Sequence, residues 1–160
     1  MAAVEGTEPL LVTTSATARA EEGMRSSVRM RDFGPVVMDE PESLGGTDRG
    51  PNPMEYVMGA LGGCVSVMIR LIAGEMGFRY AGADIHADGV LDVRGLLGTP
   101  GVRRHFQTVN LTVTLETDEP PERVAELREK VHDRCPAINL LKDAGVELRA
   151  DWRAIPSRDA

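Results

Sequence analysis

One long apolar segment constrains the fold of this chain more than any other part of its sequence. Residues 51–80 read PNPMEYVMGALGGCVSVMIRLIAGEMGFRY, and their apolar side chains recur at steps of three and four. Pro53 and Glu55 suit a first helical turn, because the N–H that proline lacks would be unpaired there and an acid complements the helix dipole. The segment predicts a helix of about 20 residues or more, which other elements must wrap. Glu55, Arg70 and Glu75 argue against a membrane-spanning helix.

Two glycines precede a cysteine in the middle of this predicted helix. Gly62 and Gly63 each cost about 1 kcal/mol relative to alanine, so a compensating gain is expected. Either another backbone packs closely against the glycines, or they give access to the sulfur of Cys64. The sequence leaves both explanations open.

The length, charge and cysteine content of the chain limit its class. Its 160 residues suffice for one domain with a core, and residues 1–8 are expected to be a loose tail. The net charge of −7 argues against a nucleic-acid partner bound through a basic face. No secretory signal is visible, so we expect a cytoplasmic protein. In a reducing cytoplasm two cysteines are either buried bystanders or a redox pair.

The N-terminal third predicts short strands. Residues 10–20, 24–31 and 35–39 are rich in alternating apolar and polar side chains, with turn residues at 21–23 and 32–34. These segments predict a three-stranded meander. Residues 40–52, punctuated by three glycines and two prolines, predict an ordered loop that leads into the long helix.

The remaining sequence predicts three strands and two helices. Residues 83–94 predict a strand with a bulge at Gly89, and residues 106–116 alternate cleanly. An amphipathic helix then begins at Pro120-Pro121 and is broken at Pro136. A short helix over 137–144 and a last strand over 146–155 complete an α+β fold.

The histidines do not indicate a metal site. His86, His105 and His132 are scattered through the sequence, without the spacing of metal ligands. We therefore expect no metal and no cofactor.

Three groups of residues carry a resemblance to a known family. Gly45-Gly46, the run GPNPME over 50–55 and the run ALGGC over 60–64 resemble the signature of the OsmC/Ohr family. A second cysteine about seventy residues later, here Cys135 before Pro136, is also similar to that family. The element order matches over about residues 10–155.

The resemblance implies an intertwined homodimer with two active sites at the subunit interface. It implies thiol-dependent reduction of organic hydroperoxides, with Cys64 as the residue that attacks the peroxide and Cys135 as the resolving cysteine. The electrons would come from a thiol reductant, a small dithiol or a lipoyl protein. An arginine held by a glutamate is expected to activate Cys64.

The sequence leaves the activating pair open. Arg19, Arg25 and Arg29 all match the family's N-terminal arginine, and Arg25, which follows the turn at Gly23, is the first candidate. The family's glutamate stands ten residues before the first cysteine, where this chain has Met54, with Glu55 nine before it.

Helical geometry places Glu55 opposite Cys64, since nine residues at about 100° each span half a turn beyond two full turns. Glu55 then lies in a distorted first turn, serves the partner subunit's site, or only complements the helix dipole.

The residues themselves form a complete chemical set for this reaction. A thiolate is needed because a thiol is a poor nucleophile, and an arginine stabilises the anion without losing its own proton. A second thiol protects the sulfenic acid from further oxidation. The alternative function is an OsmC-like protein without peroxidase activity that binds a small apolar ligand at the dimer interface. In a third interpretation both cysteines are small core residues.

Overall fold

The computed structural model describes residues 8–157, which divide into two compact units at the start of the long helix, residues 1–53 and 54–160. The predicted tail over residues 1–8 falls almost wholly outside the described residues. That the whole chain forms one domain stays a prediction.

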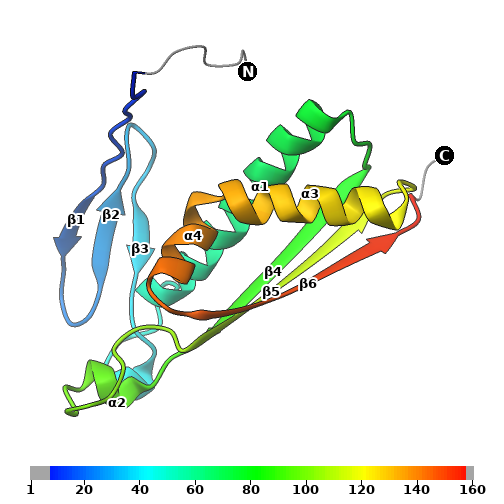
Figure 1. The fold of residues 1–160 in the computed structure, drawn as a ribbon. Coiled ribbons are helices and arrows are strands. Elements are labelled where there is room, and N and C mark those ends of the chain that lie inside the picture. Colours follow the sequence, from blue (N-terminus) through cyan, green and yellow to red (C-terminus); the bar gives the residue numbers. More distant parts are fainter. Residues whose placement is uncertain (1–7, 158–160) are drawn as a thin grey trace. The chain divides into compact units, whose positions relative to one another are not determined.

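The first unit is a three-stranded antiparallel sheet, as the sequence predicts (Figure 1). Its strands are, in order along the chain and across the sheet, β1 (Thr17–Ala20), β2 (Ser26–Arg29) and β3 (Val36–Met38). The turns between them fall at the positions that the sequence indicates. Only Val28 of the three strands is a buried apolar residue, so this unit has very little core of its own.

The first strand is much shorter than predicted. Residues 10–16 are not in a strand, and Leu11 is 88% exposed. The register explains the difference, because Thr17 pairs with Arg29, the last residue of β2. The chain then turns at Arg31, which has a φ of 53°. Residues 10–16 therefore have no neighbouring backbone in this unit with which to form a ladder.

The loop between β3 and the long helix is organised around a buried carboxylate. Asp39 is 1% exposed and accepts hydrogen bonds from the hydroxyl of Thr47, at 2.6 Å, and from the backbone N–H groups of Glu40, Thr47 and Arg49. The Thr47 hydroxyl is the largest cause that lowers the pKa of Asp39, the backbone donors add to it, and burial opposes them. A Cβ at Gly46 would lie 1.7 Å from the Glu40 carbonyl oxygen, so only glycine fits there. The loop is ordered, as predicted, and contains a 3-10 turn, η1 (Glu42–Leu44).

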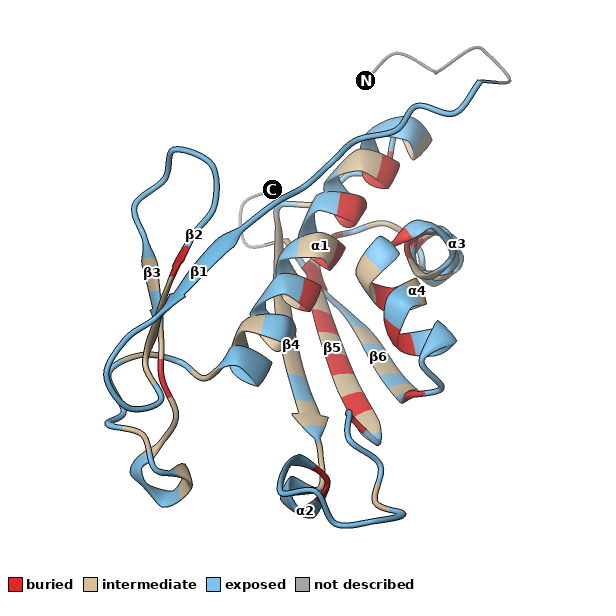
Figure 2. Cartoon of the chain, turned by 90° about the vertical axis from the view of Figure 1, so that its left-hand side faces the viewer, coloured by how far each residue is buried: buried red, intermediate tan, exposed pale blue. Residues whose placement is uncertain are grey.

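In the second unit three helices pack over one face of a three-stranded sheet, as Figures 1 and 2 illustrate. Antiparallel β4 (Gly82–Val90) and β5 (Thr108–Glu116) pair over nine residues each. β6 (Glu147–Ile155) joins β5 in parallel, because the helices α3 (Pro121–Arg134) and α4 (Pro136–Asp143) form the crossover between them. The observed fold is α+β, as predicted.

The core lies between this sheet and the helices. Every second residue of β5 is fully buried, namely Val109, Leu111, Val113 and Leu115. This confirms the alternation that the sequence shows. Figure 2 shows in red the buried residues of β5 and of the helices that cover it.

The long helix α1 (Pro53–Met76) supplies most of the helical side of this core. Its buried residues recur at steps of three and four, at Leu61, Val65, Met68, Ile69, Ile72 and Ala73. The helix ends in a Schellman motif, in which Gly77 has a φ of 60° and Phe78 N–H donates to the Ala73 carbonyl at 2.9 Å. Among the described residues α1 is the one helix that is long and apolar enough to cross a membrane by length and composition. Such a helix is weak support for a membrane span, because the core helix of a soluble protein passes the same test.

Two details of the β4 region were predicted wrongly. The bulge at Gly89 is absent, since Gly89 pairs in register with Val109. Glycine is needed there for space instead, because a Cβ would lie 2.6 Å from the ring of Phe106. The strand also ends at Val90, and the short helix α2 (Val93–Leu96) follows, capped by Asp92, whose side chain accepts from Arg94 N–H.

Candidate functional site

The structure brings the two cysteines of the second unit together. Cys64 lies in the middle of α1 and Cys135 lies between α3 and α4, 71 residues later. Their Sγ atoms are 3.4 Å apart and both thiols are free. A disulfide bond is about 2.05 Å long, so the sulfurs need to approach by about 1.4 Å to form one.

The two thiols have different surroundings. Cys64 is half-buried, whereas Cys135 is completely buried in the core. Burial raises the pKa of the Cys135 thiol, and the neighbouring Cys64 sulfur raises it further. The N–H groups of Ile138 and Ala137 at the start of α4 lower this pKa. The Cys135 side chain makes no capping hydrogen bond to α4. Cys135 is therefore held as a protonated thiol at neutral pH.

Cys135 is the single non-helical residue between two helices. Its φ and ψ of −74° and 116° are extended, and it ends α3 and begins α4. Pro136 requires this geometry, because the residue before a proline is disfavoured in the helical region. The sequence predicts a break at Pro136, and the break falls at Cys135.

The end of α3 is fixed by side chains that the sequence analysis did not single out. Asn139 Nδ2 lies 2.8 Å from the Asp133 carbonyl oxygen and 2.9 Å from that of Cys135. Lys142 Nζ donates to the His132 carbonyl at 3.2 Å. Their spacing of four and seven residues after Cys135, on one face of a helix that follows it, is the sequence signal that could have indicated these contacts.

An ion pair links α1, which carries Cys64, to the end of α3, which Cys135 follows. The guanidinium of Arg134, next to Cys135, donates to both carboxylate oxygens of Glu75 in α1. Its Nη2 lies 3.0 Å from Glu75 Oε1. Arg134 lowers the pKa of Glu75 through this hydrogen bond. A second contact joins the last residue of α1 to the first turn of α3, because Arg123 Nη2 donates to the Met76 carbonyl at 3.0 Å.

The glycines before Cys64 leave an open strip on α1. A Cβ at Gly63 would meet nothing within 4 Å, and one at Gly62 would meet only Ile85, at an ordinary 3.8 Å. Close packing within this unit therefore does not explain them. The remaining explanations are access to Cys64 and the approach of a second chain.

Arg25 lies in the first unit, immediately before β2, and both cysteines lie in the second. Its Nε donates to Glu21 Oε2 at 2.6 Å, so this arginine is held by a glutamate of its own unit. Arg19 lies in β1 and Arg29 ends β2.

Glu55 lies in the first turn of α1, and α1 is a regular α-helix from Pro53 onward. The distorted first turn that would bring Glu55 to the Cys64 of its own chain is not observed. The partner subunit's site and the helix dipole remain as its predicted roles.

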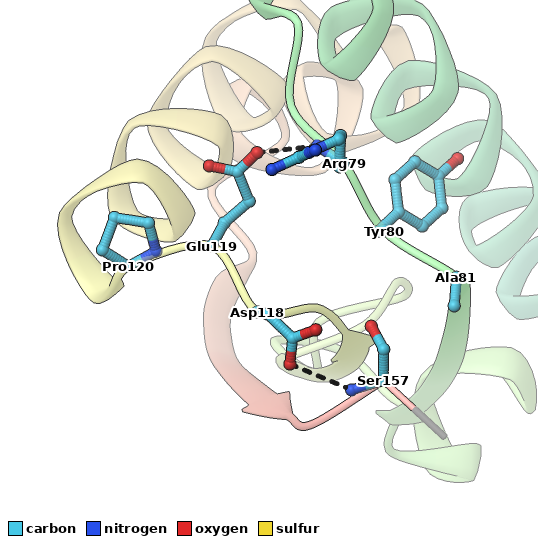
Figure 3. A pocket seen from close by; sticks show the side chains of 7 residues that line it. All are labelled: Arg79, Tyr80, Ala81, Asp118, Glu119, Pro120 and Ser157. Carbon is cyan, nitrogen blue, oxygen red and sulfur yellow. Dashed lines mark hydrogen bonds between the residues drawn. The ribbon is translucent and has the colours of Figure 1, made fainter. Parts of the chain in front are cut away.

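A polar pocket of about 470 Å³ lies elsewhere in the second unit (Figure 3). It is lined by Arg79, Tyr80, Ala81, Asp118, Glu119, Pro120 and Ser157. Both carboxylates of the pocket accept hydrogen bonds from the backbone, Glu119 from Arg79 N–H and Asp118 from Ser157 N–H. Neither cysteine lines it.

The histidines do not form a metal site among residues 8–157, where no group of three or more potential ligands comes together. His132 has a structural contact instead, because its Nε2 accepts from Trp152 Nε1 at 3.2 Å. Burial lowers the pKa of His132, and the charges of Lys142 and Arg128 lower it further. The ring is therefore neutral at pH 7 and can accept this hydrogen bond.

Solved structures of the same fold cover nearly the whole chain. An OsmC-like protein from Mycoplasma pneumoniae has a TM-score of 0.76 at 18% identity, over 92% of this chain and 99% of that one. An organic hydroperoxide resistance protein OsmC from Legionella pneumophila has a TM-score of 0.73 at 22% identity, over 91% and 99%. The organic hydroperoxide resistance protein OhrB of Bacillus subtilis has a TM-score of 0.65 at 20% identity, over 89% and 98%. No protein of curated function is close enough in sequence to count as a relative.

The fold and the paired thiols define an α+β protein whose two cysteines meet between a central helix and a helix junction. The family described as OsmC-like protein matches residues 46–150, which is more than half of the chain. The protein belongs to the OsmC-like family, as its resemblance in sequence indicates.

Proposed function

We propose that this protein reduces organic hydroperoxides with Cys64 and Cys135. The observation that carries the proposal is the 3.4 Å distance between two free thiols of unequal burial. A pair of buried bystanders would not need to meet from positions 71 residues apart. Membership of a family with hydroperoxide resistance proteins among its structural neighbours supports a redox role.

The reaction proceeds in two steps. The Cys64 thiolate attacks the terminal oxygen of the hydroperoxide and the O–O bond breaks, so that Cys64 becomes a sulfenic acid. The alkoxide that leaves takes up the proton that the Cys64 thiol released on ionisation and becomes an alcohol. The Cys135 sulfur then attacks the Cys64 sulfur. Its proton leaves with the hydroxyl group as water, and an internal disulfide remains.

The burial of the two thiols supports this assignment of roles. Cys64 is the more accessible of the two. Cys135 is fully buried with a raised pKa, which disfavours a thiolate that could attack a substrate from solvent. An external dithiol, small or carried by a lipoyl protein, returns the disulfide to two thiols in a cytoplasmic compartment.

We also propose Arg25 as the group that holds the Cys64 thiolate, with Glu55 at the same site. The Glu21 carboxylate accepts a hydrogen bond from Arg25 Nε and so orients the guanidinium, which this role needs. Because Glu55 faces away from the Cys64 of its own α1, its role in catalysis requires a second subunit.

An obligate homodimer is the first prediction. Leu10, Leu11 and Val12 are at least 74% exposed, and Val57 and Val67 of α1 are 41% and 66% exposed. A second copy would cover them with an apolar interface of more than about 2,000 Å². We expect sedimentation to give a dimer at micromolar concentration. A folded monomer at that concentration would refute the assembly and the shared site.

The second prediction tests the chemistry in the unmodified protein. One equivalent of cumene hydroperoxide should remove two free thiols per chain without cross-linking chains, because both electrons come from one cysteine pair. Thiol titration and non-reducing electrophoresis measure this. Retention of both thiols would overturn the peroxidase. It would favour the alternative, an OsmC-like protein that binds a small apolar ligand.

A further inference from the structure

The carbonyl groups at the end of α3 directly precede the buried Cys135 in the chain and bind side chains of α4. The last four carbonyl groups of a helix have no acceptor role within it. In α3 the Val131 carbonyl accepts from Cys135 N–H at 2.9 Å. The carbonyls of His132 and Asp133 would depend on water without side-chain donors.

Asn139 supplies those donors from one turn into α4. Its Nδ2 lies 2.8 Å from the Asp133 carbonyl, 2.9 Å from that of Cys135 and 3.5 Å from that of His132. A carboxamide has two N–H groups, so the two shorter distances are its full hydrogen bonds. Asn139 N–H also donates to the Cys135 carbonyl, at 3.0 Å. One residue thus ties the end of α3, the connecting residue and α4 together.

Lys142 completes this arrangement one turn later. Its Nζ donates to the His132 carbonyl at 3.2 Å. A cation at this position also opposes the negative end of the α3 dipole. Asn139 and Lys142 are called the junction clamp below.

We propose that the junction clamp positions Cys135 for its attack on oxidised Cys64. The inference rests on the proposed function. Asn139 is a positioning residue, because its side chain contacts the backbone of Cys135 and of the residues before it, and not the sulfur. The clamp holds the backbone while the Cys135 side chain supplies the approach of about 1.4 Å that a disulfide requires.

The chemical consequence is a competition at Cys64. The sulfenic acid either condenses with Cys135, with loss of water, or reacts with a second hydroperoxide molecule and becomes a sulfinic acid. A Cys135 sulfur held 3.4 Å away favours the first outcome. Since a misplacement of about 1 Å can cost about a hundredfold in rate, a looser junction should shift the balance toward the sulfinic acid.

Asn139→Asp is the sharpest test of the junction clamp. Aspartate keeps the shape but loses both donors, and its charge is repelled by the carbonyls and by the end of the α3 dipole. At a fixed excess of cumene hydroperoxide we expect the ratio of sulfinic acid to disulfide to rise at least about tenfold. Mass spectrometry of the intact chain gives this ratio.

Two further variants separate positioning from general destabilisation. In Asn139→Ser the hydroxyl can donate to the carbonyl four residues earlier, that of Cys135, so the ratio should be intermediate. Asn110→Asp is the matched control, because Asn110 Nδ2 donates to Asp88 Oδ2 at 2.7 Å on the β4–β5 pair, away from the junction. All variants are compared at a temperature at which each is folded.

The outcomes are decisive in each direction. A ratio in Asn139→Asp equal to that of the unmodified protein overturns the inference, and so does an equal rise in Asn110→Asp. If Asn139→Asp does not fold, Asn139→Ser and Lys142→Met decide by the same criterion.

An equilibrium measurement keeps the inference separate from the peroxidase proposal. The Cys64–Cys135 disulfide can be formed with diamide and equilibrated with glutathione, without any hydroperoxide. The clamp should raise the effective concentration of the pair, so Asn139→Asp should lower the equilibrium constant for the disulfide at least about tenfold. If the unmodified protein consumes no hydroperoxide, the proposed function fails, but this comparison still tests the clamp.

Discussion

Cys64→Ser should reduce the rate of hydroperoxide consumption by more than about tenfold, which corresponds to about 1.4 kcal/mol or more of activation free energy. Serine is nearly the same size as cysteine, but its hydroxyl stays protonated at neutral pH and cannot replace the thiolate. The site on α1 is half-buried and directly preceded by two glycines, so the substitution should leave the packing intact. Loss of cumene hydroperoxide, measured with an excess of dithiol, gives the rate.

The fold of this variant serves as the control. Circular dichroism and thermal unfolding of Cys64→Ser should match those of the unmodified protein. If the folded variant keeps more than about a tenth of the original rate, Cys64 is not the attacking residue.

The sequence predicted best those elements whose periodicity reflects burial on one side. α1 has apolar residues at helical spacing and β5 alternates at every second position, and both form where expected because the core lies on that side. The prediction failed where the pattern of apolar residues did not arise from burial. Residues 10–16 alternate like a strand but have no pairing partner in their unit, and propensity alone does not make a ladder.

Glycine was the most ambiguous residue type in the sequence. Gly89 suggested a bulge, yet it lies in a regular ladder and makes room for Phe106. Gly62 and Gly63 suggested close packing or access, and the described unit places nothing close against Gly63. A glycine in a sequence indicates that a Cβ is absent, but not whether space, conformation or access is the reason.

The cysteine pair could not have been predicted from the spacing alone. No periodicity relates positions 64 and 135, and the cysteine content alone left buried bystanders and a redox pair both open. The family resemblance favoured the pair. The structure adds their distance, their unequal burial and the contacts of Asn139. Those contacts depend on the extended backbone of Cys135, at which the chain turns from α3 into α4.

Neither the sequence nor the structure of a single chain assigns the roles of Arg25 and Glu55. The structure shows an ion pair between Arg25 and Glu21 at the turn that joins β1 to β2. Glu55 is on the wrong side of α1 for the Cys64 of its own chain. The completed site therefore depends on the homodimer that we propose.

Cys135→Ser should change the fate of Cys64 without preventing its first oxidation. Cys135 is buried with a raised pKa, so the attack on hydroperoxide does not depend on it. The variant should react once, rapidly and stoichiometrically, because Cys64 is unchanged. It should then turn over only slowly or with external thiol, because no internal disulfide can form. At high peroxide Cys64 should accumulate sulfinic acid, seen as a mass gain of about 32 Da.

The two serine variants together assign the roles of the thiols. Stopped-flow measurement of the first equivalent should show a fast phase in Cys135→Ser and none in Cys64→Ser. The reverse pattern would exchange the attacking and resolving residues. If both variants behaved as the unmodified protein does, the pair would be structural, and the 3.4 Å contact would reflect packing of two small core residues. We expect the first pattern, because Cys64 is the half-buried member of the pair and Cys135 the one enclosed by the core.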